Sequence, residues 1–290
     1  MQKYSKEKSD ADCKAIVNKI IPFSNVDGPG NRLVVFFQGC NARCIYCHNP
    51  ETMGYCQRCF KCIEVCPQKA LSCLNGKVEH NESLCISCDA CIRVCPHHAS
   101  PRTKIMGVDE LYEEIKAYSP YIRGVTVSGG EPLLNYNFVI KLFKKIKRES
   151  GLSCFVDTNG FFDKREMDKL IEITDKFMLD IKSVDKVREL CGIESKDSID
   201  NLKYLLKQDK VFEVRTVIVD EMDAEATVSK VAFLLKDYQD VNYKLIRVHT
   251  TGLNESRKER IKHKIPNNEK MEQIRALALE KGAKKVECIL

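Results

Sequence analysis

Three cysteines in one short stretch constrain this chain more than any other feature. Cys40, Cys44 and Cys47 follow the apolar run 33–37 with the spacing CxxxCxxC. A [4Fe–4S] cube has four irons, and ferredoxin-type sites give each iron one thiolate ligand. Three cysteines in a tight loop therefore leave one iron open, where a small molecule can bind. From this spacing alone, a zinc knuckle or part of a disulfide set is the alternative interpretation.

A second cysteine pattern is written twice between residues 55 and 99. The run CxxCxxCxxxCP begins at Cys56 and again at Cys85, a repeat period of 29 residues. In bacterial ferredoxins with this pattern, the fourth cysteine of each run ligates the cluster of the other run. A zinc ribbon would need CxxC pairs without the third CxxC step and the Cys-Pro ending. The pattern predicts two further [4Fe–4S] clusters, one on Cys56, Cys59, Cys62 and Cys95 and the other on Cys85, Cys88, Cys91 and Cys66.

Composition argues against several classes of protein. The 290 residues include sixteen cysteines, but we see no apolar run of membrane-spanning length and no signal-peptide core. The cysteines therefore indicate metal ligation in a reducing, cytoplasmic compartment, without a membrane partner. The formal charge of +6 does not argue for a nucleic-acid partner, because cluster charges of roughly −2, −2 and −1 bring it to about +1. The other cysteines are expected to be small buried residues: Cys13, Cys73, Cys154, Cys191 and Cys288.

Strand and helix signals alternate along most of the chain. Apolar runs predict strands over 33–37, 124–128, 153–157, 177–182, 211–219 and 243–249. Helical periodicity predicts helices over 108–118, 135–149, 164–173, 199–208, 224–237 and 267–281. Repeated βα units favour a parallel sheet, and six strands are fewer than the eight of a closed barrel. We expect an α/β protein: a partial (β/α)6 TIM-like barrel over 16–54 and 100–290, a two-cluster ferredoxin-type insert over 55–99, and a flexible N-terminus over 1–15.

Alternation within the later strands predicts a polar cavity. In 177–182 the even residues Met178, Asp180 and Lys182 share one face, and the odd residues on the other face are apolar. A packed barrel lumen would instead be branched and apolar. Ordinary solvent exposure of one sheet face is the alternative. The same division places Phe212, Val214 and Ile218 opposite Glu213 and Arg215, and puts Arg247 and His249 on one face.

The cluster stretch and the residues before it resemble a known superfamily. CxxxCxxC with the aromatic Tyr46 just before its third cysteine is similar to the signature of radical S-adenosylmethionine (SAM) enzymes. The run VDGPGNR over 26–32, followed by Phe36 and then Gly39, resembles the branch that installs a glycyl radical on a partner enzyme. The run KIIPFS over 19–24 and the cysteine-rich insert resemble the YjjW-type activases within that branch. The resemblance extends from about residue 20 onward.

The resemblance also implies the SAM site. SAM would chelate the open iron of the Cys40, Cys44 and Cys47 cluster, and no catalytic residue is implied beyond that cluster. GGE at 129–131, DTNG at 157–160 and DxK at 180–182 match motifs of the family. A monovalent cation is implied on Asp157, Asp180 and the backbones of Thr158 and Met178. The implied SAM-binding residues are Tyr46, Cys47, His48, Gly129, Gly130, Glu131, Thr158, Asp180, Ile181, Lys182, Arg215 and His249.

A glycyl radical enzyme activase is the implied function. Reductive cleavage of SAM would give a 5′-deoxyadenosyl radical that removes a glycine Cα hydrogen from a partner protein. The implied partners are a glycyl radical enzyme and a flavodoxin or ferredoxin electron donor, in an anaerobic cytoplasm. Two alternatives stay open: a radical SAM enzyme acting on a small molecule or peptide, and an iron–sulfur electron-transfer protein. The insert clusters could relay electrons or shape docking, and the basic run 141–148 is a solvated helix face or a flavodoxin dock.

Overall fold

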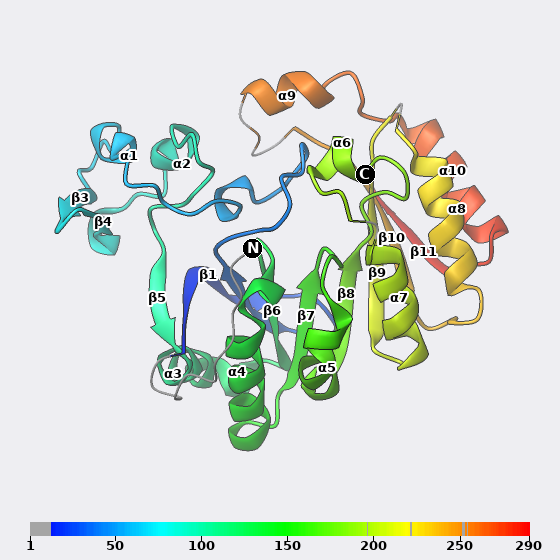
Figure 1. Cartoon of the computed structure of the whole chain (residues 1–290), viewed down its shortest axis with the longest axis horizontal. Coiled ribbons are helices and arrows are strands. Elements are labelled where there is room, and N and C mark those ends of the chain that lie inside the picture. The colour runs from blue at the N-terminus through cyan, green and yellow to red at the C-terminus, as the bar shows by residue number, and fades with distance from the viewer. Residues whose placement is uncertain (1–12, 196, 221, 251–252, 254) are drawn as a thin grey trace.

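A mixed sheet of nine strands organises the part of the chain that is described. The computed structural model describes residues 13–290 except 196, 221, 251, 252 and 254 (Figure 1). The strand order is β11-β10-β9-β8-β7-β6-β2-β1-β5. β2 and the strands from β6 to β11 run parallel, whereas β1 is antiparallel to both β2 and β5. The strands are β1 Lys14–Ser24, β2 Arg32–Phe37, β5 Lys104–Gly107, β6 Gly124–Gly129, β7 Ser153–Thr158, β8 Lys176–Asp180, β9 Val211–Ile218, β10 Asn242–Arg247 and β11 Lys285–Ile289.

Helices connect the successive parallel strands, as the alternating pattern predicts (Figure 1). The six predicted strands and the six predicted helices all form, with ends that differ by two residues or fewer. β1, β5 and β11 were not predicted; the short edge strands β5 and β11 lack a continuous apolar run. The range 1–15 is expected to be flexible, but Lys14 already belongs to β1, and residues 1–12 lie outside the described residues. The helices are α3 Val108–Tyr118, α4 Tyr136–Glu149, α5 Lys164–Ile173, α6 Val187–Cys191, α7 Asp197–Lys207, α8 Ala224–Leu235, α9 Glu255–Ile261 and α10 Asn268–Glu280.

The two faces of the parallel strands meet different surroundings. Phe177, Leu179 and Ile181 belong to the large core that the sheet shares with the helices. Met178 and Asp180 alternate with them and lie outside that core cluster. The alternation predicted for this stretch is therefore confirmed. Burial of the outer face holds the sheet to its helices, at about 1.5–3 kcal/mol for each fully buried large apolar side chain.

Two side chains depart from the predicted alternation. The register of β9 against β8 slips by one residue after Phe177, which is a β-bulge. Phe212 consequently leaves the helix-side core, and its ring meets Phe155 edge-on with the centroids 5.5 Å apart. Arg247 does not point into a cavity beside His249, because its Nη1 donates to Oδ1 of Asn268 at the start of α10 (2.7 Å).

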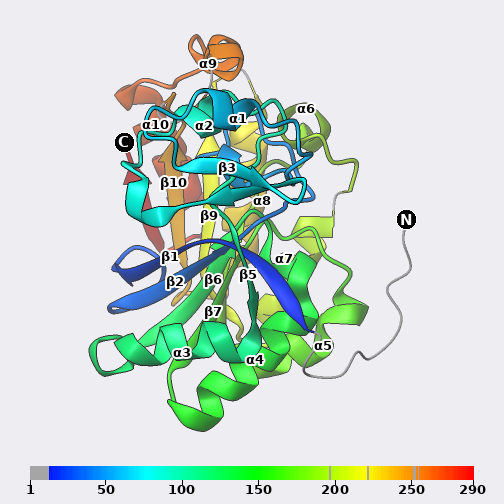
Figure 2. The same ribbon diagram turned by 90° about the vertical axis from the view of Figure 1, so that its left-hand side faces the viewer.

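Residues 55–99 contain a small unit with its own sheet and core. The unit holds the antiparallel pair β3 Leu71–Leu74 and β4 Lys77–His80, with helices α1 Lys61–Glu64 and α2 Ala90–Arg93. Its core is formed by Cys62, Leu71 and Cys91. Figures 1 and 2 both place this unit at the end of the sheet where α6 and α9 lie, which is the carboxyl end of the parallel strands.

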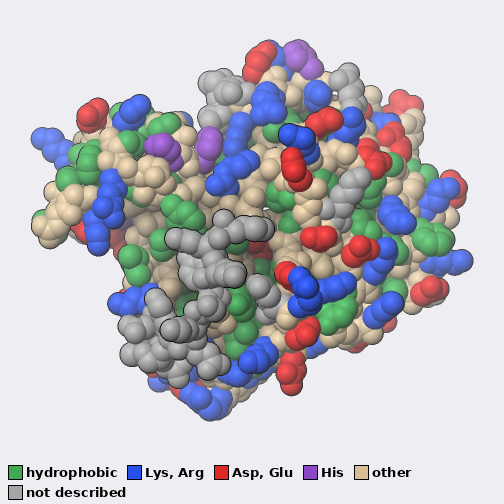
Figure 3. Space-filling view, in the orientation of Figure 1, with side chains coloured by type: hydrophobic (Ala, Val, Ile, Leu, Met, Phe, Trp, Pro, Cys, Tyr) green, Lys and Arg blue, Asp and Glu red, His purple; other side chains and the backbone are tan. Residues whose placement is uncertain are grey.

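The surface carries mixed charge. Basic and acidic side chains are interspersed over the face shown in Figure 3. None of the helices in the described part of the chain is long and apolar enough to span a membrane.

A fully buried arginine from the DGPGNR run ties three strands together. The guanidinium of Arg32 donates to Oγ1 of Thr126 (2.8 Å), the carbonyl of Val125 (2.8 Å) and Oγ of Ser153 (2.9 Å). It also stacks on the ring of Phe155, 4.1 Å from the centroid. Burial lowers the pKa of Arg32 to about 10, so the charge persists at neutral pH and its hydrogen bonds offset the cost of burying it.

Replacing Arg32 with methionine should lower the free energy of unfolding by about 3 kcal/mol or more, because acceptors on β6 and β7 lose their donors. Urea-induced unfolding measures this loss. The matched control is Arg148→Met on α4, where the side chain is 70% exposed, and a change within about 0.5 kcal/mol is expected. Equal losses in the two variants would contradict the anchoring role.

Candidate functional site

The CxxxCxxC stretch is an extended loop held on both sides by backbone hydrogen bonds. On one side the amide of Cys40 donates to the carbonyl of Met53 (3.0 Å). On the other side the amides of Arg43 and Ile45 donate to carbonyls of α6, at Cys191 and Leu190 (2.7 and 2.9 Å). Three residues of the loop between its cysteines, Ala42, Ile45 and Tyr46, are buried. The three cysteines therefore project from a fixed backbone that begins where β2 ends.

Burial and a neighbouring thiol shift the pKa values of the three thiols in this loop in different directions. Burial raises the pKa of Cys40 to about 12 and that of Cys47 to about 11. A hydrogen bond with the buried Cys191 thiol is the largest cause that lowers the pKa of Cys44 to about 7. Burial opposes ionisation of these thiols. Coordination to a metal removes the proton from a thiol, so a bound cluster would offset that effect. Since each iron of a [4Fe–4S] cluster takes one thiolate, three cysteines in this loop are compatible with a cluster that keeps one iron open.

The glycines of the GGE segment let β6 approach the cluster loop. Gly129 has φ +114°, and a Cβ there would collide with the backbone of Phe37. A Cβ on Gly130 would collide with the carbonyl of Gly39. The amide of Glu131 donates to that same carbonyl (2.8 Å). The two glycines are thus required by the packing of two backbones, independent of any ligand.

The Glu131 carboxylate links the GGE segment to the DTNG segment. It is 1% exposed and accepts hydrogen bonds from Oγ1 of Thr158 (2.8 Å) and the amides of Asn159 (2.9 Å) and Leu133 (3.1 Å). Burial raises the pKa of Glu131 to about 7, but three donors favour the ionised form that can only accept. Asn159, which the sequence did not single out, donates from Nδ2 to Oδ1 of Asn41 in the cluster loop (2.7 Å). The sequence signal that could have identified Asn159 as a site residue is its place inside the DTNG motif.

Charged side chains gather on the inner face of β7, β8 and β9. Arg215 contacts Oδ2 of Asp157 (3.3 Å) and, through Nη2, the sulfur of Met178 (3.3 Å). Nζ of Lys182 lies 2.7 Å from Oδ2 of Asp180. Two carboxylates and two cations are therefore brought together, as the motifs predict. Two partners were not anticipated: Ser128 donates to Asp157 (3.0 Å), and the buried Glu213 pairs with Arg215 (2.6 Å).

The remaining predicted residues divide between the site and the core. The rings of His48 and His249 stack with centroids 4.1 Å apart and an interplanar angle of 14°. This contact joins the end of the cluster loop to the segment after β10. Ile181, in contrast, turns its side chain into the helix-side core, and its amide donates to the carbonyl of Arg215 (2.8 Å). Only its backbone faces the site. The side chain of Tyr46 is also buried, at 2% exposure.

Eight of the nine cysteines of residues 55–99 line two small cavities. One cavity is lined by Cys56, Cys59, Cys62 and Cys95, and the other by Cys66, Cys85, Cys88 and Cys91. Each cavity thus has three cysteines from one run and the last cysteine of the other run. No three His, Cys, Asp or Glu side chains of the described residues converge as closely as a single metal ion requires. No two of the sixteen cysteines form a disulfide. Cys154 and Cys191 are buried as expected, whereas Cys13 and Cys288 are half-buried and Cys73 is exposed on β3.

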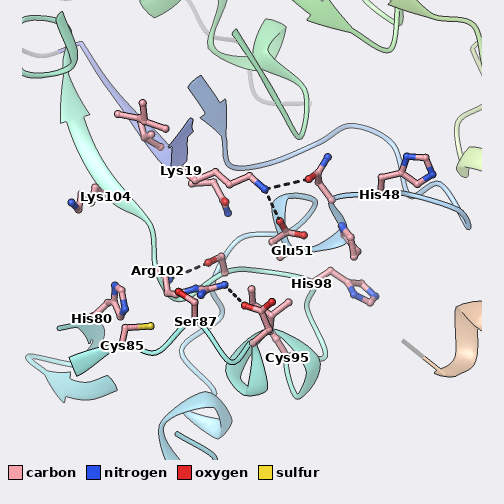
Figure 4. A pocket seen from close by; sticks show the side chains of 18 of the residues that line it. Lys19, His48, Glu51, His80, Cys85, Ser87, Cys95, His98, Arg102 and Lys104 are labelled. Carbon is pink, nitrogen blue, oxygen red and sulfur yellow. Dashed lines mark hydrogen bonds and ion pairs between the residues drawn. The ribbon is translucent and has the colours of Figure 1, made fainter. Parts of the chain in front are cut away.

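A cleft of about 1050 Å³ lies between this unit and the sheet (Figure 4). Its walls carry charges of both signs. Lys19 contacts Glu51 on one side (3.6 Å), and Arg102 contacts Asp89 on the other (2.6 Å). His48 lines the cleft, so the cleft reaches the cluster loop.

On α4, much of the basic run 141–148 is paired with acidic side chains. Lys145 pairs with Asp109 and Lys147 with Asp175 (both 2.6 Å).

Comparison with known proteins identifies the class. The family model of the radical SAM superfamily matches residues 34–230, and the chain belongs to this superfamily. The crystal structure of QueE from Escherichia coli superimposes with a TM-score of 0.55 over 96% of this chain and 95% of that one. At 13% identity, this likeness shows a shared α/β fold alone.

Relatives with assigned names identify the branch of the superfamily to which the chain belongs. A Haemophilus influenzae protein named as a glycyl-radical enzyme activating enzyme is 34% identical over 94% of this chain and 96% of its own length. The choline trimethylamine-lyase activating enzyme of Oleidesulfovibrio alaskensis is 29% identical over 83% of this chain and 85% of its own length. Within the superfamily, the chain belongs to the glycyl-radical enzyme activating enzymes. Membership implies a [4Fe–4S] cluster and SAM as its cofactors.

Replacing Glu131 with glutamine should cost about 1–3 kcal/mol of unfolding free energy, because the amide nitrogen cannot accept from the donors that surround it. Chemical denaturation measures the cost. Glu189→Gln on α6, where the side chain is 57% exposed, is the matched control and should change little. A glutamine variant as stable as the parent would show that the carboxylate does not hold the two segments together.

Proposed function

We propose that this radical SAM enzyme activates a glycyl radical enzyme by removing one hydrogen from a glycine Cα of that partner. One observation carries the proposal: the cluster loop, GGE, DTNG and DxK segments meet at the carboxyl ends of neighbouring parallel strands. When bound, SAM and the reduced cluster supply a 5′-deoxyadenosyl radical. The residues of the chain bind, orient and shield that chemistry.

The charged residues of the inner face have a direct role in this proposal. Cys40, Cys44 and Cys47 would hold the cluster, with SAM on its open iron. Lys182 and Arg215 would meet the carboxylate of SAM. Asp157 and Asp180, with the backbones of Thr158 and Met178, would hold a monovalent cation, because hard cations take carboxylate and carbonyl oxygens. His48 and His249, stacked at the rim, would flank the ribose. Glu131 acts as a positioning residue, since its carboxylate is occupied by protein donors.

The architecture suits a protein substrate. We propose that the sheet is a partial TIM-like barrel over 16–54 and 100–290, whose edge strands β5 and β11 leave it open. An open mouth admits a loop of a partner protein more readily than a closed barrel would. We place the enzyme in an anaerobic cytoplasm, because the cluster with an open iron is sensitive to oxygen.

We propose that residues 55–99 are a ferredoxin-type domain with two [4Fe–4S] clusters. Support comes from the two cavities, whose cysteines are sorted in the crossed way that the ferredoxin pattern requires. The core of this unit contains few apolar side chains besides its cysteines, so cluster binding should contribute to its folding. A flavodoxin or ferredoxin would serve as the electron donor.

Electron paramagnetic resonance (EPR) tests the activase function. The reconstituted enzyme is mixed anaerobically with SAM, dithionite and a candidate glycyl radical enzyme. A persistent doublet is expected, and it should be absent when the partner glycine is changed to alanine. Cys44→Ser should abolish it by removing a cluster ligand, while Cys73→Ser, an exposed cysteine outside the three sets, should retain it.

Other outcomes point to the alternatives. Continuous release of 5′-deoxyadenosine without a doublet, with every candidate partner, would favour a small-molecule or peptide substrate. No 5′-deoxyadenosine despite intact clusters would leave only an electron-transfer protein.

The role of the insert clusters is tested by Cys88→Ala combined with Cys91→Ala. The parent should bind about twelve irons, four for each of three clusters, and the variant about four fewer. If the clusters relay electrons, SAM cleavage should persist with dithionite and fail with flavodoxin. Equal loss with both reductants would indicate a structural role, and full activity with both would contradict the relay.

A further inference from the structure

We infer that the two insert clusters have a fixed order, and that the set Cys56, Cys59, Cys62 and Cys95 passes electrons to the SAM cluster across the contact between Tyr55 and Gly39. We call this set the proximal site, and the set Cys66, Cys85, Cys88 and Cys91 the distal site. The inference rests on the proposed ferredoxin-type clusters. The internal repeat cannot supply the order, because both runs have the same spacing. Tertiary contacts distinguish the proximal site from the distal site.

The wall of the proximal cavity is bonded to the segment that precedes it in the chain. His97, Ala99 and Pro101 line that cavity. In the same stretch, the carbonyl of His98 accepts from the amide of Gly54 (2.8 Å), and the amide of Ser100 donates to the carbonyl of Glu51 (2.9 Å). Residues 97–101 and 51–54 thus lie side by side as paired backbone.

The segment 51–54 is bonded in turn to the SAM-cluster loop. The amide of Gly39 donates to the carbonyl of Thr52 (2.7 Å), and the amide of Cys40 donates to the carbonyl of Met53 (3.0 Å). The proximal wall, segment 51–54 and the cluster loop are therefore three consecutive hydrogen-bonded segments. Cys56 reaches Cys40 through three covalently linked residues and one hydrogen bond.

An aromatic side chain of the insert lies against the SAM-cluster loop. Tyr55 precedes Cys56 in the chain, and its ring and hydroxyl lie against Gly39, where a Cβ would collide with them. Gly39 has φ +99°, so glycine serves both the backbone conformation and the close contact. A Cβ on Gly54 would collide with the carbonyl of His97. Gly39 and Gly54 thus permit close contacts next to Cys40 and two residues before Cys56.

The distal site lies farther along the insert. Its cavity is lined by residues between 66 and 102, including Leu71 of β3, and His80 and Arg102. Figure 4 shows Cys85 and His80 at the end of the cleft away from His48, with Cys95 and His98 between them. An electron entering at the distal site therefore has the proximal site on its way to the cluster loop.

The proposed transfer involves electrons only. A low-potential one-electron donor of the flavodoxin class is oxidised by one electron, which the distal site accepts. The proximal site then accepts it, and the Tyr55–Gly39 contact carries it to the SAM cluster. No covalent bond forms or breaks, and no proton is required before SAM is cleaved.

The repeat offers a matched pair of variants for the test. Cys59→Ala with Cys62→Ala removes proximal ligands, and Cys88→Ala with Cys91→Ala removes the equivalent distal ligands. In the dithionite-reduced full-length protein, magnetic coupling of the SAM-cluster EPR signal to a neighbouring cluster should survive the distal change and be lost with the proximal change. The reverse result would overturn the order. An intact chain that binds only about four irons would instead overturn the ferredoxin-type clusters.

A second measurement keeps all ligands and so does not depend on variants that lose a cluster. Tyr55→Leu should slow reduction of the SAM cluster by flavodoxin, followed by stopped-flow absorbance, with iron content unchanged. Tyr55→Phe keeps the ring and should restore the rate. Tyr121→Leu, at a tyrosine 69% exposed and outside the insert, should leave it unchanged. An unchanged rate in Tyr55→Leu would overturn the assigned path.

Discussion

The site depends on the backbone hydrogen bonds that hold the CxxxCxxC loop from both sides. Segment 52–53 accepts from its beginning and α6 accepts from its middle. Because these bonds involve only the main chain, they fix the positions from which three cysteines project, whatever the side-chain rotamers. That rigidity matters because burial makes two of the thiols harder to ionise, and ligands held in place bind a cluster without further ordering cost.

Buried charges of the sheet and its loops are each satisfied by several partners. Arg32 joins three strands, Glu131 joins the GGE and DTNG segments, and Glu213 accepts from Arg215 and Lys244. Leaving any of these groups without partners would cost several kcal/mol. Such networks contribute to specificity by permitting one arrangement of the strand ends. The apolar outer face supplies the stability, and the polar inner face supplies the site.

Much of the fold and of the site could be predicted from local pattern. Apolar runs and helical periods located six strands and six helices, because each pattern reports which face an element buries. Edge strands such as β11 escaped, since half-exposed residues carry little periodic signal. Two departures from the pattern depend on neighbours far away in the chain. They are the bulge that turns Phe212 inward and the hydrogen bond from Arg247 to Asn268. The role of Asn159 was not predicted, because its partner in the cluster loop is 118 residues away in the chain.

The sequence by itself determined the donor chemistry. Cysteine spacing within one loop specifies how many thiolates a cluster receives, because a few covalent bonds limit where those sulfurs can reach. Tertiary structure alone decided how the donor groups are arranged relative to one another. The glycines at 39 and 54 permit contacts that distinguish two cysteine runs of identical spacing, and the sheet brings carboxylates of separate strands to one edge. Such contacts form only when the strands are in register, so no local pattern encodes them.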